Sequence, residues 1–197
     1  MHASVAVEEK ELLRGIPAAR VALIERIARA AAGGRTRKEL PQRFLRAYFH
    51  GVAEEDLAER APEQLARAAL AHLEFGARRA PGRTLARVFN PEPGRDGFES
   101  PHTLVFTVTD DMPFLVDSLG MAFARAELAV HLIVHPVLQV RRDRRGQLVD
   151  IGSNGAEAPH PESWQLYEID RISEPAQLAR LCHLSAPRPV CIRRPRP

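Results

Sequence analysis

Polar and apolar residues alternate over positions 102–109, and this alternation is the clearest local signal in the chain. A period of two in a segment rich in threonine and valine predicts a β-strand. From 114 to 126 the apolar spacing changes to three and four residues, which predicts an amphipathic helix. In the turn between them, Asp111 is suited to cap the helix and Pro113 to occupy its first turn. One face of the predicted strand carries only large apolar residues, namely Leu104, Phe106 and Val108.

An almost wholly apolar run follows at 128–140, and we expect it to form one strand buried on both faces. The basic run 141–146 (RRDRRG) is predicted to be a solvated hairpin tip. Residues 163–172 predict a further strand, and a helix follows from Ser173. Upstream, residues 84–90 (TLARVFN) predict one additional strand.

This β-α-β-β-α order, with one extra strand before it, predicts an α+β fold of the ferredoxin-like or ACT-like type. The strands that flank the helix are then parallel and lie in one sheet, because such crossovers are right-handed. The preceding residues predict helices, since Pro17, Pro41 and Pro62 each open a stretch with helical apolar spacing. We therefore expect a helical N-terminal unit, an α+β domain and a disordered Pro/Arg-rich tail, at residues 1–80, 84–181 and 182–197.

The composition is that of a globular protein, with 45% hydrophobic and 27% charged residues among 197. No apolar run reaches the roughly 18 residues that a membrane helix needs. The N-terminus shows no basic segment followed by an apolar one, so a secretion signal is not expected. These features favour a cytoplasmic protein without a membrane partner.

The net charge of +3 and the isoelectric point of about 9.3 raise the question of nucleic-acid binding. The arginines are spread along the chain among 25 acidic residues, which indicates a compositional bias rather than a binding patch. Residues 128–140 also lack the aromatic side chains on which an RNA-recognition sheet stacks bases. We therefore expect no nucleic-acid partner.

The chain offers few candidates for chemistry. Asp110 and Asp111 could act as general acid and base, or could simply place negative charge at a helix start. Ser118 lacks the G-x-S-x-G surroundings of a hydrolase nucleophile. No glycine-rich phosphate loop follows any predicted strand. We accordingly assign no catalytic and no cofactor-binding residue.

His131 and His135 share one face of a predicted strand with Ile133 between them. Four strand residues span about 13 Å, which is too far for both imidazoles to bind one ion. They are structural or interface histidines instead, and no metal site is expected. The two cysteines, Cys182 and Cys191, have no metal-binding spacing and are expected to be reduced thiols.

Four segments together point to a family: TDDMPFLVDSL, HLIVHPVLQVRRD, LARVFNP and SWQLYEIDR. They resemble the N-terminal region of the large bacterial NAD-specific glutamate dehydrogenases. That resemblance implies an ACT-type regulatory module in an enzyme that converts L-glutamate to 2-oxoglutarate and ammonia. It also implies that NAD binds domains far downstream, so that this chain alone is inactive.

ACT modules commonly bind amino acids where the first strand turns into the first helix. The resemblance places that turn here at Asp111–Phe114, with Phe114 where the family usually has glycine. A side chain at this position crowds a ligand, which favours packing or subunit contact. Residues considered for effector or subunit contact are Asp110, Asp111, Met112, Pro113, Phe114, His131 and His135.

Three functions stay open at this point. The first is a regulatory or assembly fragment of the dehydrogenase, whose partners are its own copies or the downstream domains. The second is a separate ACT-type amino-acid sensor, and the third is a structural interaction module. The Pro/Arg-rich sequence from Cys182 is unlike the family, from which we expect a truncated chain.

Overall fold

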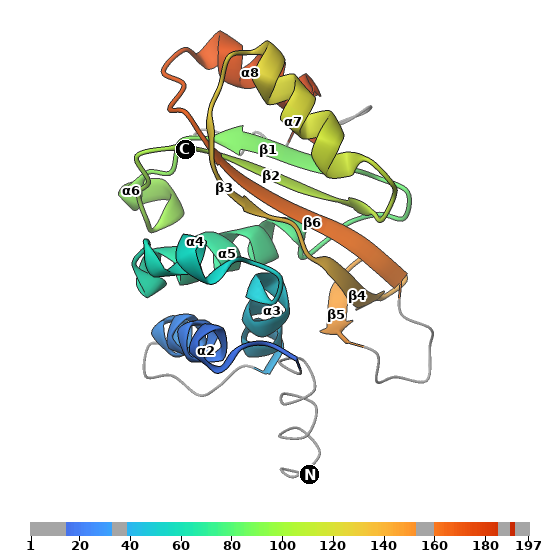
Figure 1. Cartoon of the computed structure of the whole chain (residues 1–197). Helices are drawn as coiled ribbons and strands as arrows, with labels where there is room; N and C mark the ends of the chain where they lie inside the picture. Colours follow the sequence, from blue (N-terminus) through green and yellow to red (C-terminus); the bar gives the residue numbers. More distant parts are fainter. Residues whose placement is uncertain (1–14, 33–38, 153–159, 185–189, 192–197) are drawn as a thin grey trace. The chain divides into compact units, whose positions relative to one another are not determined.

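The computed structural model describes residues 15–32, 39–152, 160–184 and 190–191 (Figure 1). The chain divides into two compact units, residues 1–74 and 75–197. Among the described residues, four helices begin in the first unit: α2 (Ala18–Ala32), α3 (Glu39–Phe49), α4 (Glu54–Ala58) and α5 (Pro62–Gly76). None of the described helices is both long enough and apolar enough to cross a bilayer.

The first unit is built around the aromatic face of α3. The rings of Phe44 and Tyr48 are in contact and tilted by 31°, with centroids 4.8 Å apart, and Phe49 meets Tyr48 edge-on. The Tyr48 hydroxyl shares a hydrogen bond of 2.7 Å with Nδ1 of His72 on α5, and both residues are buried. A buried polar pair is tolerated when each group has a partner, as here.

The second unit is a seven-stranded sheet with helices α6 (Pro93–Asp96), α7 (Leu115–Arg125) and α8 (Pro175–Leu184). The strands are β1 (Leu85–Phe89), β2 (Thr103–Asp110), β3 (Val130–Val134), β4 (Val137–Arg142), β5 (Leu148–Ile151), β6 (His160–Ile169) and β7 (Val190–Cys191). They are ordered β5-β4-β6-β2-β1-β7. Strand β3 pairs with the second half of β6, and β4 pairs with its first half. Because β2 and β3 both run antiparallel to β6, they are parallel to each other, as the crossover predicts.

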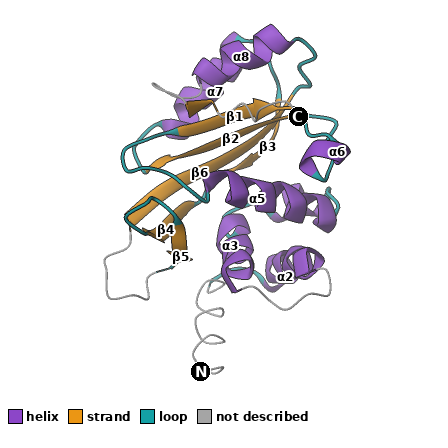
Figure 2. Ribbon diagram, turned by 180° about the vertical axis from the view of Figure 1, so that it is seen from behind, coloured by secondary structure: helices purple, strands orange, loops and turns teal. Residues whose placement is uncertain are grey.

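Helices α7 and α8 lie on one face of this sheet (Figures 1 and 2). Val105 of β2 and Tyr167 of β6 are register partners, and both pack under the helices against Leu119 and Phe123 of α7. Residues of the opposite parity, such as Phe106, belong to the other face, where they are also buried. The α+β prediction of a sheet with helices is therefore confirmed, and the residues of β2 are buried on both of its faces.

The prediction of one doubly buried strand over 128–140 is wrong. The run is interrupted at His135–Pro136, and burial alternates along both pieces. Leu132 and Leu138 are buried, whereas Ile133 and Val137 are exposed. Only one face of this part of the sheet is covered, so a continuous apolar sequence here does not mean two buried faces.

The expected cap at Asp111 is not formed. Helix α7 begins at Leu115, and its N-cap residue is Phe114, which makes no side-chain capping bond. Phe114 has φ 64° and ψ 16°, in the left-handed region that glycine adopts most easily. Its carbonyl accepts hydrogen bonds from the backbone and side chain of Ser118.

Helix α8 continues through Cys182 to Leu184, so the start of the predicted tail is helical. Cys182 is buried and disulfide-bonded, which makes the expectation of a reduced thiol wrong for this residue. The prediction of a disordered tail otherwise falls mostly on positions 185–189 and 192–197, which lie outside the described residues.

Candidate functional site

A fully buried carboxylate, Glu162, lies at the centre of the most polar part of the second unit. It sits on β6 opposite Asp110 of β2, and its side chain is 0% exposed. Burying an unpaired carboxylate is very unfavourable, so this group needs several donors. It has them: two arginines and the indole N–H of Trp164 all donate to its oxygens.

Arg79 provides the first of these guanidinium groups, from the segment just after α5. Its Nε and Nη2 donate to Glu162 Oε1 over 3.1 and 2.7 Å, and Nη2 also donates to Asp110 Oδ1 over 2.5 Å. Its Nη1 donates to the carbonyl of Arg83. Burial by itself lowers the pKa of Arg79, but the hydrogen bonds that it donates to Asp110 and Glu162 raise the pKa above its ordinary value. Arg79 therefore stays charged.

Arg142 of β4 provides the second guanidinium from the opposite side. Its Nε and Nη2 donate to the two oxygens of Glu162 over 2.7 and 2.9 Å, a bidentate geometry that favours a strong ion pair. The remaining donors reach the carbonyls of Gly76, Ala77 and Gly146. The side chain is only 11% exposed, so it is not part of the solvated hairpin tip that the basic run predicts.

Two glycines allow the backbone to approach this cluster closely. A Cβ on Gly76 would collide with the Trp164 ring, and one on Gly146 would collide with the Arg79 carbonyl. Gly146 also has φ +78°. The cluster therefore depends on small residues on both sides as well as on its charges.

Asp110 and His160 form the outer rim of the cluster. His160 Nε2 donates to Asp110 Oδ1 over 3.1 Å, and the His160 side chain is 64% exposed. Burial raises the pKa of Asp110, but Arg79 and His160 lower it to below its ordinary value. Burial likewise raises the pKa of Glu162, while Arg142 and then Arg79 lower it further than burial raises it. Both carboxyls are therefore ionised near neutral pH.

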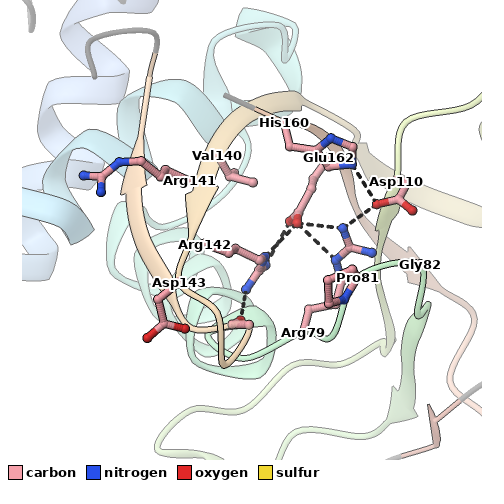
Figure 3. Close-up of a pocket in the computed structure, with 11 residues that line it drawn as sticks. Arg79, Pro81, Gly82, Asp110, Val140, Arg141, Arg142, Asp143, His160 and Glu162 are labelled. Atoms are coloured by element: carbon pink, nitrogen blue, oxygen red, sulfur yellow. Dashed lines mark hydrogen bonds and ion pairs between the residues drawn. The ribbon is translucent and has the colours of Figure 1, made fainter. Parts of the chain in front are cut away.

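A cavity of about 370 Å³ opens beside this cluster (Figure 3). Figure 3 shows the charged groups of Arg79, Arg142, Glu162 and Asp110 directed toward one another, while Arg141 and Asp143 point away from Glu162. The lining residues are Arg79, Pro81, Gly82, Asp110, Val140, Arg141, Arg142, Asp143, Gly146, His160 and Glu162.

The chemistry that this arrangement allows is binding rather than acid–base catalysis. All five N–H groups of Arg142 and both oxygens of Glu162 are already engaged, so neither can readily take or give a proton. No group of three or more metal-ligating side chains is arranged to hold an ion within the part of the chain that the structure describes.

Of the residues considered for effector or subunit contact, only Asp110 belongs to this cluster. Asp111, Met112 and Pro113 are exposed in the turn before α7, and Phe114 is 75% exposed. His131 and His135 lie on the exposed side of the broken β3–β4 run. The structure thus separates the predicted residues into the turn and the histidine face, with Asp110 alone at the cavity.

His131 has partners at the end of the sheet. Its Nε2 donates to Asp170 Oδ1 over 2.8 Å, and its ring stacks on His102 with centroids 4.2 Å apart. Asp170 also accepts from the backbone N–H of Ala129. This group ties the start of β3 to the end of β6, which agrees with a structural role for His131.

Sequence reasoning missed Glu162, Arg79, Arg142 and His160. One signal was available: Glu162 has the same parity as Trp164 and Leu166 along β6, so an acidic residue falls on a buried face. An acid at such a position requires a buried cation. Which arginines supply it is not readable from the sequence, because the partners come from two distant segments.

Comparison with known proteins identifies a family and its relatives. The sequence profile described as "Glutamate dehydrogenase, ACT1 domain" matches residues 44–184. The NAD-specific glutamate dehydrogenase of Halomonas elongata is 36% identical over 140 residues, and that of Pseudomonas aeruginosa is 33% identical over 149. These matches cover 70% and 73% of this chain but only 9% of each relative. No solved structure matches the chain significantly.

Proposed function

The chain belongs to the glutamate dehydrogenase ACT1-domain family, and from this membership we propose that it is a regulatory or assembly region of an NAD-specific glutamate dehydrogenase. The observation that carries the proposal is the profile match from α3 to the end of α8, which includes the whole cluster around Glu162. In such an enzyme this region would influence the oxidation of L-glutamate to 2-oxoglutarate and ammonia without carrying it out.

The chemistry of hydride transfer supports a regulatory rather than a catalytic role for this region. A nicotinamide dinucleotide usually binds at a strand, a glycine-rich turn and a helix, because the helix N-terminus accepts the pyrophosphate. This sequence has no G-x-G-x-x-G segment. We therefore propose that NAD binds to other parts of the enzyme and that this region acts through contacts.

The proposal can be tested by transplantation. Residues 44–184 would replace the matching segment of the Pseudomonas aeruginosa enzyme, and NAD reduction by L-glutamate would be measured in the chimera and in the 197-residue chain alone. We expect an active chimera and an inactive chain. NAD reduction by the chain alone, or a folded chimera without activity, would contradict the proposal.

A chimera that also carries Glu162→Gln provides the matched control. Glu162 is fully buried and is the shared partner of Arg79 and Arg142, so it is central to this fold. If the region acts through its structure, this chimera loses stability or assembly, and its activity falls with the assembled fraction. An unassembled chimera with full activity would argue against an assembly role.

A second candidate function is amino-acid sensing at the turn from Asp110 to Phe114. It is favoured by the backbone of Phe114, which adopts the left-handed conformation that the family's usual glycine would supply, with its side chain directed largely into solvent. Thermal unfolding of the chain with a panel of amino acids at millimolar concentration tests this function. The absence of stabilisation by any of them would count against it.

A third candidate is a structural interaction module. It is favoured by β3, which pairs only with β6 among the described strands and exposes Val130 and Ile133. Exposed strand edges with apolar side chains favour pairing with another chain. Sedimentation of the wild-type chain and of the His131→Glu variant tests self-association. If both sediment as monomers, this function is excluded.

A further inference from the structure

We propose that the cavity beside Arg79 and Glu162 is a binding site for a small zwitterion of the α-amino-acid class. It lies on the face of the sheet opposite α7 and α8. Tyr167 packs under those helices, and Glu162 has the other parity along β6. The site is therefore separate from the turn at residues 111–114, and the regulatory meaning of binding there rests on the proposed function.

The charges at the cavity favour a ligand that carries both signs. The ionised groups directed toward one another are two guanidiniums, Arg79 and Arg142, and two carboxylates, Asp110 and Glu162 (Figure 3). A ligand with only negative charge is repelled by the two carboxylates, and a ligand with only positive charge is repelled by the two guanidiniums. A zwitterion can place each of its charges beside the opposite one.

The cluster leaves donors and acceptors that are not fully satisfied by its own hydrogen bonds. Among the described residues, no partner is found for Asp110 Oδ2, for His160 Nδ1 or for one of the two Nη1 hydrogens of Arg79. Arg79 Nη2 and His160 Nε2 both hydrogen-bond to Asp110 Oδ1, so the side chains of Arg79, Asp110 and His160 are close neighbours. An α-amino acid carries its ammonium and carboxylate on one carbon, which matches an acceptor and donors placed side by side.

In this arrangement the ligand ammonium donates to Asp110 Oδ2. The ligand carboxylate accepts from Arg79 Nη1 and, when His160 is protonated, from its Nδ1. The apolar part of the wall, which includes Pro81 and Val140, is left for the ligand side chain. Space is available beside Gly82, since a Cβ there would meet no atom within 4 Å. The volume of about 370 Å³ is near the lower end of the range for small-molecule sites.

Titration calorimetry on the purified 197-residue chain tests this site. The probes are the common L-amino acids and, for the tightest of them, its N-acetyl derivative and the amine that lacks the carboxylate. We expect at least one amino acid to bind, and each derivative to bind about tenfold or more weakly, since each loses one charged hydrogen bond.

Two variants locate the binding. Asp110→Asn removes the proposed ammonium acceptor and should weaken binding about tenfold or more. Asp111→Asn changes the neighbouring aspartate, which is exposed in the turn and does not line the cavity, and should leave binding unchanged. His160→Gln, at a largely exposed residue, should weaken binding several-fold with little effect on folding. His183→Gln on α8 is its matched control.

The proposal is overturned if no amino acid binds at concentrations up to about 10 mM, if the N-acetyl derivative binds as well as its parent, or if Asp111→Asn rather than Asp110→Asn abolishes binding. Failure here is distinguishable from failure of the proposed function. An active chimera with a chain that binds no amino acid removes only the cavity site, whereas an inactive chimera with specific binding to the chain removes only the dehydrogenase role.

Discussion

Arg79 and Glu162 are 83 positions apart in the sequence, yet Arg79 Nη2 donates to Glu162 Oε1 over 2.7 Å in a nearly inaccessible ion pair. The pair fastens the segment that follows α5 to β6, and Arg142 fastens β4 to the same carboxylate. A buried ion pair adds little net stability compared with well-packed apolar residues, but removing one partner leaves the other charge unpaired. Glu162 therefore joins three segments, namely the one after α5, β4 and β6, at a single buried carboxylate.

The first prediction concerns the charge of Glu162. Glu162→Gln keeps the size of the side chain but leaves two buried guanidiniums without their shared carboxylate, so we expect the free energy of unfolding to fall by about 3 kcal/mol. Urea denaturation of the 197-residue chain measures this. Glu99→Gln, at an exposed position, should change the value by less than about 0.5 kcal/mol. Similar losses of unfolding free energy in both variants would show that the two arginines do not need the Glu162 carboxylate for stability.

The second prediction concerns pH. The pKa values of Glu162 and Asp110 are lower in the folded chain than their ordinary values, because the arginines outweigh the effect of burial. A carboxyl whose pKa is lowered by folding contributes stability that is present above its unfolded pKa and is lost as the pH falls through the folded one. Stability should therefore decline from about pH 4.5 downward.

Thermal unfolding between neutral and acidic pH measures that decline. In Glu162→Gln the decline should be shallower, since one of the two titrating groups is absent. A steeper or equal acid dependence in this variant would mean that other carboxyls dominate acid unfolding.

How much of this molecule is predictable from sequence depends on the range of the interactions. Strand β2, helix α7 and the parallel relation of β2 to β3 follow from local periodicity and the crossover rule, and the structure has all three. The break at Pro136 and the exposure of Ile133 do not follow, because burial of one face depends on which elements cover the sheet.

The candidate site shows the same limit. Asp110 was identifiable because it ends a strong strand pattern. Arg79 and Arg142 resemble any of the other arginines in an arginine-rich chain, and only the register Asp110↔Glu162 with the approach of β4 selects them. Sequence patterns predict elements, whereas the pairing of buried charges is a property of their assembly.

The third prediction compares two glycines with similar backbone angles. Gly146 and Gly97 have φ of +78° and +76°, so alanine is strained at both. A Cβ at Gly97 would meet nothing within 4 Å, but one at Gly146 would collide with the Arg79 carbonyl. Gly97→Ala should cost about 1 kcal/mol, and Gly146→Ala clearly more. Thermal unfolding of both variants checks this, and equal losses would mean that the approach of Gly146 to Arg79 is not tight.

The last prediction concerns the strain stored at Phe114. Its φ of 64° is unfavourable for a bulky residue, and its side chain is 75% exposed, so little burial is lost on truncation. Glycine relieves the strain but also makes the unfolded chain more flexible, whereas alanine keeps the strain without the ring. We expect Phe114→Gly to be more stable than Phe114→Ala by about 1 kcal/mol in thermal unfolding. If alanine is instead the more stable of the two, the turn before α7 relaxes out of the left-handed conformation, and the argument for amino-acid sensing at this turn loses its structural support.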